Sequence, residues 1–129
     1  MAVVVLDASV VIAFLDANDS HHTRAVSALS AAMTSDVVLP ASAYAEVLVE
    51  PWRRGADAVA HVRKFVADFG IRIEPLTAEV AERAARLRSR HRGLRLPDAL
   101  VLAATDILDA DVLTCDRTWT RVSRRAEVI

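Results

Sequence analysis

Cysteine is almost absent from this 129-residue chain, because Cys115 is the only one. A single cysteine cannot form a disulfide within the chain, so we expect a reducing compartment and hence the cytoplasm. Glycine and proline are also scarce, with 3 and 4 residues, and the hydrophobic fraction of 53% excludes a disordered chain. Asp7 interrupts the apolar N-terminal run, and no run approaches the roughly 18 residues of a membrane span. We therefore expect one folded domain over residues 1–129, with no targeting or membrane segment.

Lysine is nearly absent as well, since the basic residues are 15 arginines and one lysine. The net charge of −1 argues against a protein that binds nucleic acid through its bulk charge. Six arginines lie between Arg83 and Arg95 with no acid among them, and removing their +6 from the total of −1 leaves −7 for the other residues. The sequence therefore predicts a basic stripe on a mildly acidic body, although a coding bias toward arginine would give the same composition.

Short apolar runs alternate along the chain with segments of helical periodicity. The expected strands are residues 2–6, 36–40, 71–76 and 110–116, with 126–129 as a fifth candidate. The expected helices are 9–19, 21–33, 42–50, 59–69, 77–91 and 96–109, with Ser9, Ser20, Ser42 and Thr77 as N-caps. Because the strands alternate with helices and carry no hairpin signals, we predict an α/β fold with an open parallel sheet and helices on both faces.

Four acids fall at one edge of this predicted sheet. Asp7 follows the first strand directly, and Asp116 follows the fourth. Glu46 lies in the opening turns of the helix after the second strand, and Asp98 lies in the first turn of the most apolar helix. Because ligands of open α/β sheets gather at the carboxyl ends of the strands, we expect these four carboxylates to meet there.

Each acid also has a purely structural alternative, which the sequence leaves open. Asp98 could stabilise the positive end of its own helix, and Asp7 could cap the following helix together with Ser9. Asp116 could belong to a turn, and Glu46 could lie on a solvated helix face. Four independent structural acids would, however, all have to fall at the same edge of one sheet by chance.

Four clustered carboxylates repel one another strongly and need a counter-charge. Mg²⁺ or Mn²⁺ suits them, because these hard cations prefer carboxylate oxygens and water. The hydroxyls of Ser9 and Thr114, each two residues from an acid, could orient a carboxylate or a bound water. Such a metal site leaves coordination positions for water and a phosphodiester, which predicts hydrolysis of nucleic acid. Arg92 and Arg95, within six residues of Asp98, could guide a phosphate backbone to the site.

Four motifs in this order resemble those of the PIN domain family: "VVVLDAS", "AYAEVL", "LRLPDALVLAAT" and "VLTCDRTW". The likeness spans nearly the whole chain, and the compact length is similar to that of VapC-type toxins of bacterial toxin–antitoxin pairs. The resemblance implies a three-layer α/β/α sandwich, an endoribonuclease that depends on Mg²⁺ or Mn²⁺, frequent homodimers, and inhibition by a VapB-type antitoxin that covers the acidic site. It also implies roles for particular residues: Asp7, Glu46, Asp98 and Asp116 as catalytic and metal-site acids, and Ser9 and Thr114 as supporting hydroxyls.

Two other functions remain open from the sequence. A Mg²⁺-dependent phosphoacceptor or phosphatase-like α/β domain would use one aspartate as its nucleophile. Receiver domains of that kind need a lysine after the last strand, whereas the only lysine here, Lys64, falls in the middle of a predicted helix. A non-catalytic PIN-like interaction module is the second alternative, and its metal affinity would not depend on Asp98.

Overall fold

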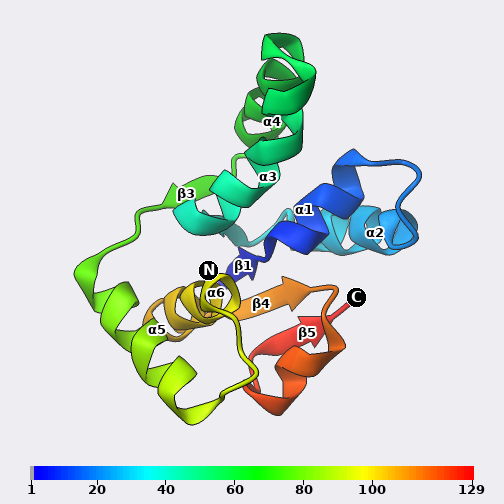
Figure 1. Cartoon of the computed structure of the whole chain (residues 1–129). Coiled ribbons are helices and arrows are strands. Elements are labelled where there is room, and N and C mark those ends of the chain that lie inside the picture. Colours follow the sequence, from blue (N-terminus) through cyan, green and yellow to red (C-terminus); the bar gives the residue numbers. More distant parts are fainter. Residues whose placement is uncertain (1) are drawn as a thin grey trace.

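The computed structural model describes residues 2–129, and within them five strands form one parallel sheet in the order β3-β2-β1-β4-β5. The strands are β1 (Val3–Leu6), β2 (Asp36–Pro40), β3 (Arg72–Glu74), β4 (Asp111–Thr114) and β5 (Ala126–Val128). Every neighbouring pair runs parallel, which confirms the predicted open sheet and the α/β class. The first strand of the chain lies at the centre of the sheet, between β2 and β4 (Figure 1).

Helices cover both faces of the sheet (Figure 1). One face carries α1 (Ala8–Leu15), α2 (His22–Ala32), α3 (Ala41–Arg54) and α4 (Ala56–Asp68), and the other carries α5 (Ala78–Arg90), α6 (Leu96–Ile107) and the short 3₁₀ helix η1 (Arg117–Arg121). Right-handed crossovers between parallel strands produce this division, because the chain moves outward from β1 to β3 and then returns across the sheet to β4. The molecule is therefore the expected three-layer α/β/α sandwich.

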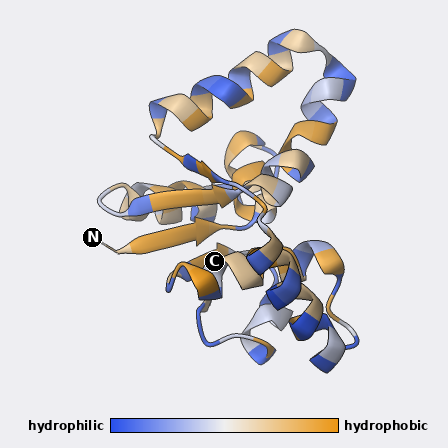
Figure 2. Ribbon diagram, turned by 90° about the vertical axis from the view of Figure 1, so that its left-hand side faces the viewer, coloured by the Kyte–Doolittle hydropathy of each residue, from blue (hydrophilic) through white to orange (hydrophobic). Residues whose placement is uncertain are grey.

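The central strands supply the middle of the core, and their ribbons are the most hydrophobic in Figure 2. Val5 pairs with Val38 on one side and with Val112 on the other, and all three side chains are fully buried. Strands buried on both faces need continuous apolar runs of this kind. Outside the sheet, the ring of Phe14 in α1 lies 5.0 Å from that of Phe65 and 5.3 Å from that of Phe69, which fastens α4 to α1. Across residues 2–129, the helices are all too short or too polar to cross a membrane.

Only one of the four predicted N-caps makes a capping hydrogen bond. The backbone amide of Val80 donates to Thr77 Oγ1 at 3.2 Å at the start of α5, as predicted. The predictions for Ser9, Ser20 and Ser42 were wrong, because α1 begins at Ala8, α2 begins at His22, and α3 begins at Ala41 directly after β2. The serine hydroxyls were therefore free for other partners, and for Ser9 that partner belongs to the candidate site.

Candidate active site

Asp7 lies at the carboxyl end of the central strand β1 and is only 8% exposed. Its Oδ2 atom accepts a hydrogen bond from Ser9 Oγ at 2.7 Å and another from Thr114 Oγ1 at 2.9 Å. Burial raises the pKa of Asp7 above its ordinary value, the two hydroxyls act in the opposite direction, and the nearby charge of Asp98 raises it further. Asp7 is thus a desolvated carboxylate whose charge is held by two donors.

The same two hydroxyls also tie the end of β4 to the site. Thr114 Oγ1 accepts from the backbone amide of Asp116 at 3.0 Å, and Ser9 Oγ accepts from the backbone amide of Cys115 at 3.1 Å. Each hydroxyl therefore donates to Asp7 and accepts from the segment that follows β4, and Thr114 is fully buried while it does so. These bonds fix the Asp7 carboxylate relative to the loop that carries Asp116.

Glu46 and Asp98 approach Asp7 from helices on opposite faces of the sheet. Glu46 lies in the second turn of α3, and Asp98 is the third residue of α6. The pKa of Glu46 is raised, first by partial desolvation and then by the negative charges of Asp7 and Asp98. These three predicted acids therefore lie within electrostatic reach of one another.

Asp116 occupies the N-cap of η1, where its Oδ1 atom accepts from the backbone amide of Thr118 at 2.9 Å and from Thr118 Oγ1 at 2.7 Å. The structural alternative for this acid is thus observed, because Asp116 does stabilise a turn. Its charge also acts on the guanidinium of Arg95, so Asp116 lies within electrostatic reach of that side chain.

The two arginines predicted as phosphate contacts differ in their surroundings. Arg92 is exposed in the loop between α5 and α6. Arg95 is the N-cap residue of α6, and its Nε and Nη2 atoms lie 3.2 and 3.3 Å from the two carboxylate oxygens of Asp98. The pKa of Arg95 is raised, mainly by its hydrogen bond to Asp98 and by the charge of that carboxylate.

The oxygen-only donor set suits a hard divalent cation, and the buried carboxylate of Asp7 is a natural ligand for one. Over residues 2–129, however, no three His, Cys, Asp or Glu side chains converge as a ready set of metal ligands. Two of the acids have other partners, since Asp98 pairs with Arg95 and Asp116 accepts from Thr118. The residues therefore fit such a cation chemically, and a cation bound there would share the carboxylates of Asp98 and Asp116 with these partners.

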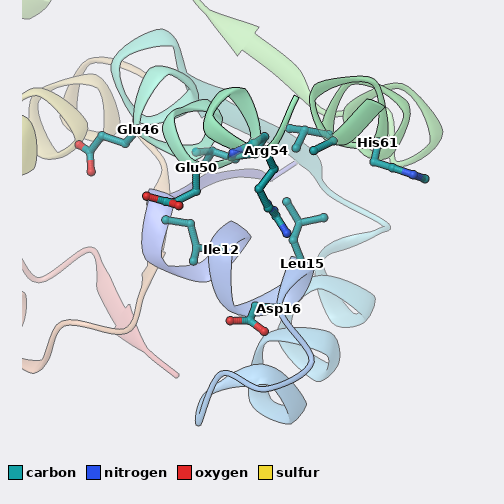
Figure 3. A pocket seen from close by; sticks show the side chains of 11 residues that line it. Ile12, Leu15, Asp16, Glu46, Glu50, Arg54 and His61 are labelled. Atoms are coloured by element: carbon teal, nitrogen blue, oxygen red, sulfur yellow. The ribbon is translucent and has the colours of Figure 1, made fainter. Parts of the chain in front are cut away.

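A groove beside the acids was not predicted from the sequence. It has a volume of about 560 Å³ and extends from Glu46 along α3, between α1 and α4 (Figure 3). Ile12 and Leu15 of α1 line it and are 42% and 40% exposed, while Arg54 and His61 lie at the end away from Glu46. The sequence signal that could have indicated this groove is the pair of aliphatic residues Ile12 and Leu15, which lie three positions apart in a short helix.

One of the comparisons with known proteins identifies a family. The PIN domain family matches residues 4–125. Comparison with curated protein sequences finds no match. Among solved structures, a toxin–antitoxin complex from Klebsiella pneumoniae contains a chain with a TM-score of 0.78 and 18% identity, and the alignment covers 97% of this chain and 96% of that one.

Two further solved structures are similar over almost their whole length. VapC20 from Mycobacterium tuberculosis, a toxin described as cleaving the sarcin–ricin loop, has a TM-score of 0.77 and 22% identity, with 92% and 93% of the two chains covered. VapBC2 from Rickettsia felis, bound to a DNA fragment from its promoter, has a TM-score of 0.81 and 11% identity, with 98% of each chain covered. At these identities the likeness establishes the fold.

Proposed function

Because the chain belongs to the PIN domain family, we propose that it is a Mg²⁺- or Mn²⁺-dependent endoribonuclease and the toxin of a VapBC-type toxin–antitoxin pair. The observation that carries this proposal is the buried carboxylate of Asp7 at the end of β1, within electrostatic reach of Glu46 and Asp98. Uncompensated carboxylates in such a group repel one another, and a hard divalent cation relieves that repulsion. An acidic site of this kind is suited to phosphodiester hydrolysis.

In the proposed mechanism, four acids would hold the cation: Asp7, Glu46, Asp98 and Asp116. The bound cation supplies a water of lowered pKa and stabilises charge on the phosphate. Ser9 and Thr114 keep Asp7 Oδ2 in one orientation through their hydrogen bonds of 2.7 and 2.9 Å. Arg92 and Arg95, on the loop before α6, bind the phosphate backbone and position the scissile bond.

The proposal includes protein partners. The Klebsiella pneumoniae structure is described as a toxin–antitoxin complex, and the Rickettsia felis structure as VapBC2. We propose a VapB-type antitoxin for this chain, with the groove beside Glu46 offering the apolar side chains of Ile12 and Leu15 for it to cover. A homodimer is the proposed assembly, and the cytoplasm, which the single cysteine favours, is the proposed location.

The phosphoacceptor alternative has less support. The only lysine, Lys64, lies in α4, where its Nζ atom is 2.7 Å from Asp68 Oδ2 in an exposed ion pair. It is therefore engaged in its own helix and not at the end of a strand, where a receiver domain would need it. Mn²⁺ binding distinguishes the interaction-module alternative from the nuclease, because a module without catalytic acids would have no Mn²⁺ affinity that depends on Asp98.

Cleavage of a mixed RNA pool by the purified wild type and by Asp98→Asn tests the proposal, with Mn²⁺, Mg²⁺ or EDTA added in parallel. We expect wild-type cleavage only with a divalent cation and a loss of at least about 100-fold in the variant, because one metal ligand has been neutralised. Asp106→Asn is the matched control, since Asp106 lies near the other end of α6 and faces Arg83 and Arg125.

The outcomes separate the proposed activity from its rivals. Cleavage by Asp98→Asn at the wild-type rate would contradict the site assignment. Equal cleavage by all three proteins in EDTA would identify a contaminating nuclease. Absence of both cleavage and Mn²⁺ binding in the wild type would favour the interaction module.

A further inference from the structure

Arg95 lies over the acids from the solvent side. Its side chain is 72% exposed, whereas that of Asp98, to which it is bonded, is only 15% exposed. The planar guanidinium meets both oxygens of the carboxylate, with Nε 3.2 Å from Oδ2 and Nη2 3.3 Å from Oδ1. This two-point contact occupies the atoms that Asp98 would offer to a metal ion.

The charge of Arg95 reaches more than its immediate partner. Asp98, Glu46 and Asp116 all stabilise the guanidinium, in that order of effect. In return, Arg95 is the positive charge that opposes the upward shift of the Glu46 pKa. One exposed arginine is therefore bonded to Asp98 and lies within electrostatic reach of Glu46 and Asp116.

We propose that Arg95 is the built-in counter-ion of the acidic site, which holds Asp98 until a divalent cation displaces it and frees the guanidinium for an RNA phosphate. This inference rests on the proposed function. Arg95 competes with a cation for Asp98, because its guanidinium already engages both carboxylate oxygens and its positive charge repels a cation at such short range. Metal binding therefore includes the cost of breaking this ion pair, and Arg95 acts as a positioning residue that lowers the affinity of the free protein for metal.

Once displaced, Arg95 stays on the loop that enters α6, beside the acids. A guanidinium fork matches two phosphate oxygens as well as two carboxylate oxygens. The same residue can thus exchange a carboxylate for a phosphate when the cation arrives. This exchange couples loading of the metal to capture of the substrate.

Isothermal titration calorimetry with Mn²⁺ tests the competition without any cleavage assay. Because Arg95 is exposed, its ion pair has the modest strength of surface pairs, so we expect Arg95→Ala to bind Mn²⁺ about two- to fivefold more tightly than the wild type. Arg92→Ala is the matched control, since it removes the same charge from an exposed position in the same loop. Its Mn²⁺ affinity should stay near that of the wild type. The Mn²⁺ affinity of Arg95→Lys should lie between those of the wild type and Arg95→Ala, because an ammonium group cannot contact both oxygens of Asp98 in the way a guanidinium does.

Two results would overturn the inference while leaving the nuclease proposal intact. One is wild-type Mn²⁺ binding that Arg95→Ala leaves unchanged or weakens. The other is equal tightening by Arg92→Ala and Arg95→Ala, which would indicate a general charge effect and no competition for Asp98. A wild type that binds no Mn²⁺ at all would overturn both proposals, and normal Mn²⁺ affinities in a protein that cleaves no RNA would count against the nuclease activity alone.

Discussion

The hydroxyl of Thr114 can be removed with almost no change in shape by Thr114→Val, and the structure predicts a large loss of stability. Thr114 is fully buried, donates to Asp7 Oδ2 at 2.9 Å and accepts from the amide of Asp116 at 3.0 Å. The substitution therefore leaves a buried carboxylate short of one donor and a backbone amide short of its acceptor.

The magnitude follows from these two bonds. A hydrogen bond to a charged group contributes about 1.5 to 3 kcal/mol, and an orphaned buried donor costs about 1 to 3 kcal/mol. The amide of Asp116 is only partly buried, so water recovers some of its loss. We expect Thr114→Val to lower the free energy of unfolding by about 2 to 4 kcal/mol at pH 7, which moves a urea midpoint by roughly 1 to 2 M.

The cost should depend on pH in a definite direction. The hydroxyl of Thr114 lowers the pKa of Asp7 against the effect of burial, so removing it raises that pKa further. The lost bond is strongest above the pKa of Asp7 in the folded protein, where the carboxylate is charged. Below that pKa the bond is a neutral one worth about 0.5 to 1.5 kcal/mol, so the cost should shrink in mild acid.

Urea denaturation in EDTA, followed by the fluorescence of the buried Trp119, measures this cost at pH 7 and pH 5. Thr105→Val is the control, because Thr105 is equally buried but its hydroxyl donates to the backbone carbonyl of Val101 four residues earlier in α6. That carbonyl keeps its helical bond, so the control should cost less than about 1 kcal/mol at either pH. Equal costs for the two variants at pH 7 would refute the assigned role of Thr114.

Two further predictions concern the same surface. Because burial raises the pKa of Asp7, its ionised form destabilises the folded state at neutral pH, and Asp7→Asn should raise the thermal midpoint of the metal-free protein. Thermal unfolding in EDTA should show this gain at pH 7.5 and lose it as the pH falls below the pKa of Asp7; a lower midpoint at pH 7.5 would contradict it. Arg92→Ala should weaken RNA binding and reduce the slope of log K against log salt by about 0.7, as measured by filter binding in EDTA. An unchanged slope would show that Arg92 makes no phosphate contact.

The sheet and the edge that carries the acids were predictable because their signals are local. Two short apolar runs, Val3–Leu6 and Asp36–Pro40, have the length and flanking residues that are typical of buried strands. Once the strands are parallel, topology alone places the residues after β1 and β4 side by side. Asp7 and Asp116 could therefore be brought to one edge without any knowledge of side-chain contacts.

The partners of the individual side chains were not predictable in the same way. Ser9 is a residue type that often caps helices, but its hydroxyl instead donates to Asp7 Oδ2, two positions earlier, at 2.7 Å. Such competition depends on rotamers and on burial, which no spacing encodes. The pairing of Arg95 with Asp98 did have a local signal, since residues three apart at the start of a helix face one another. From the sequence we predict a phosphate contact for Arg95 and not this pairing.

The bond between Thr114 and Asp7 joins residues 107 positions apart, and this separation has a consequence for synthesis. The central strand β1 is made before β4, and Asp7 at its end has no buried donor from β4 until Thr114 has left the ribosome. At about 5 to 20 residues per second, that interval lasts roughly 5 to 20 s. A nascent chain that ends before Thr114 therefore holds its first acid without the strand that buries and orients it. The candidate site therefore cannot be completed before Thr114 has been made and has left the ribosome.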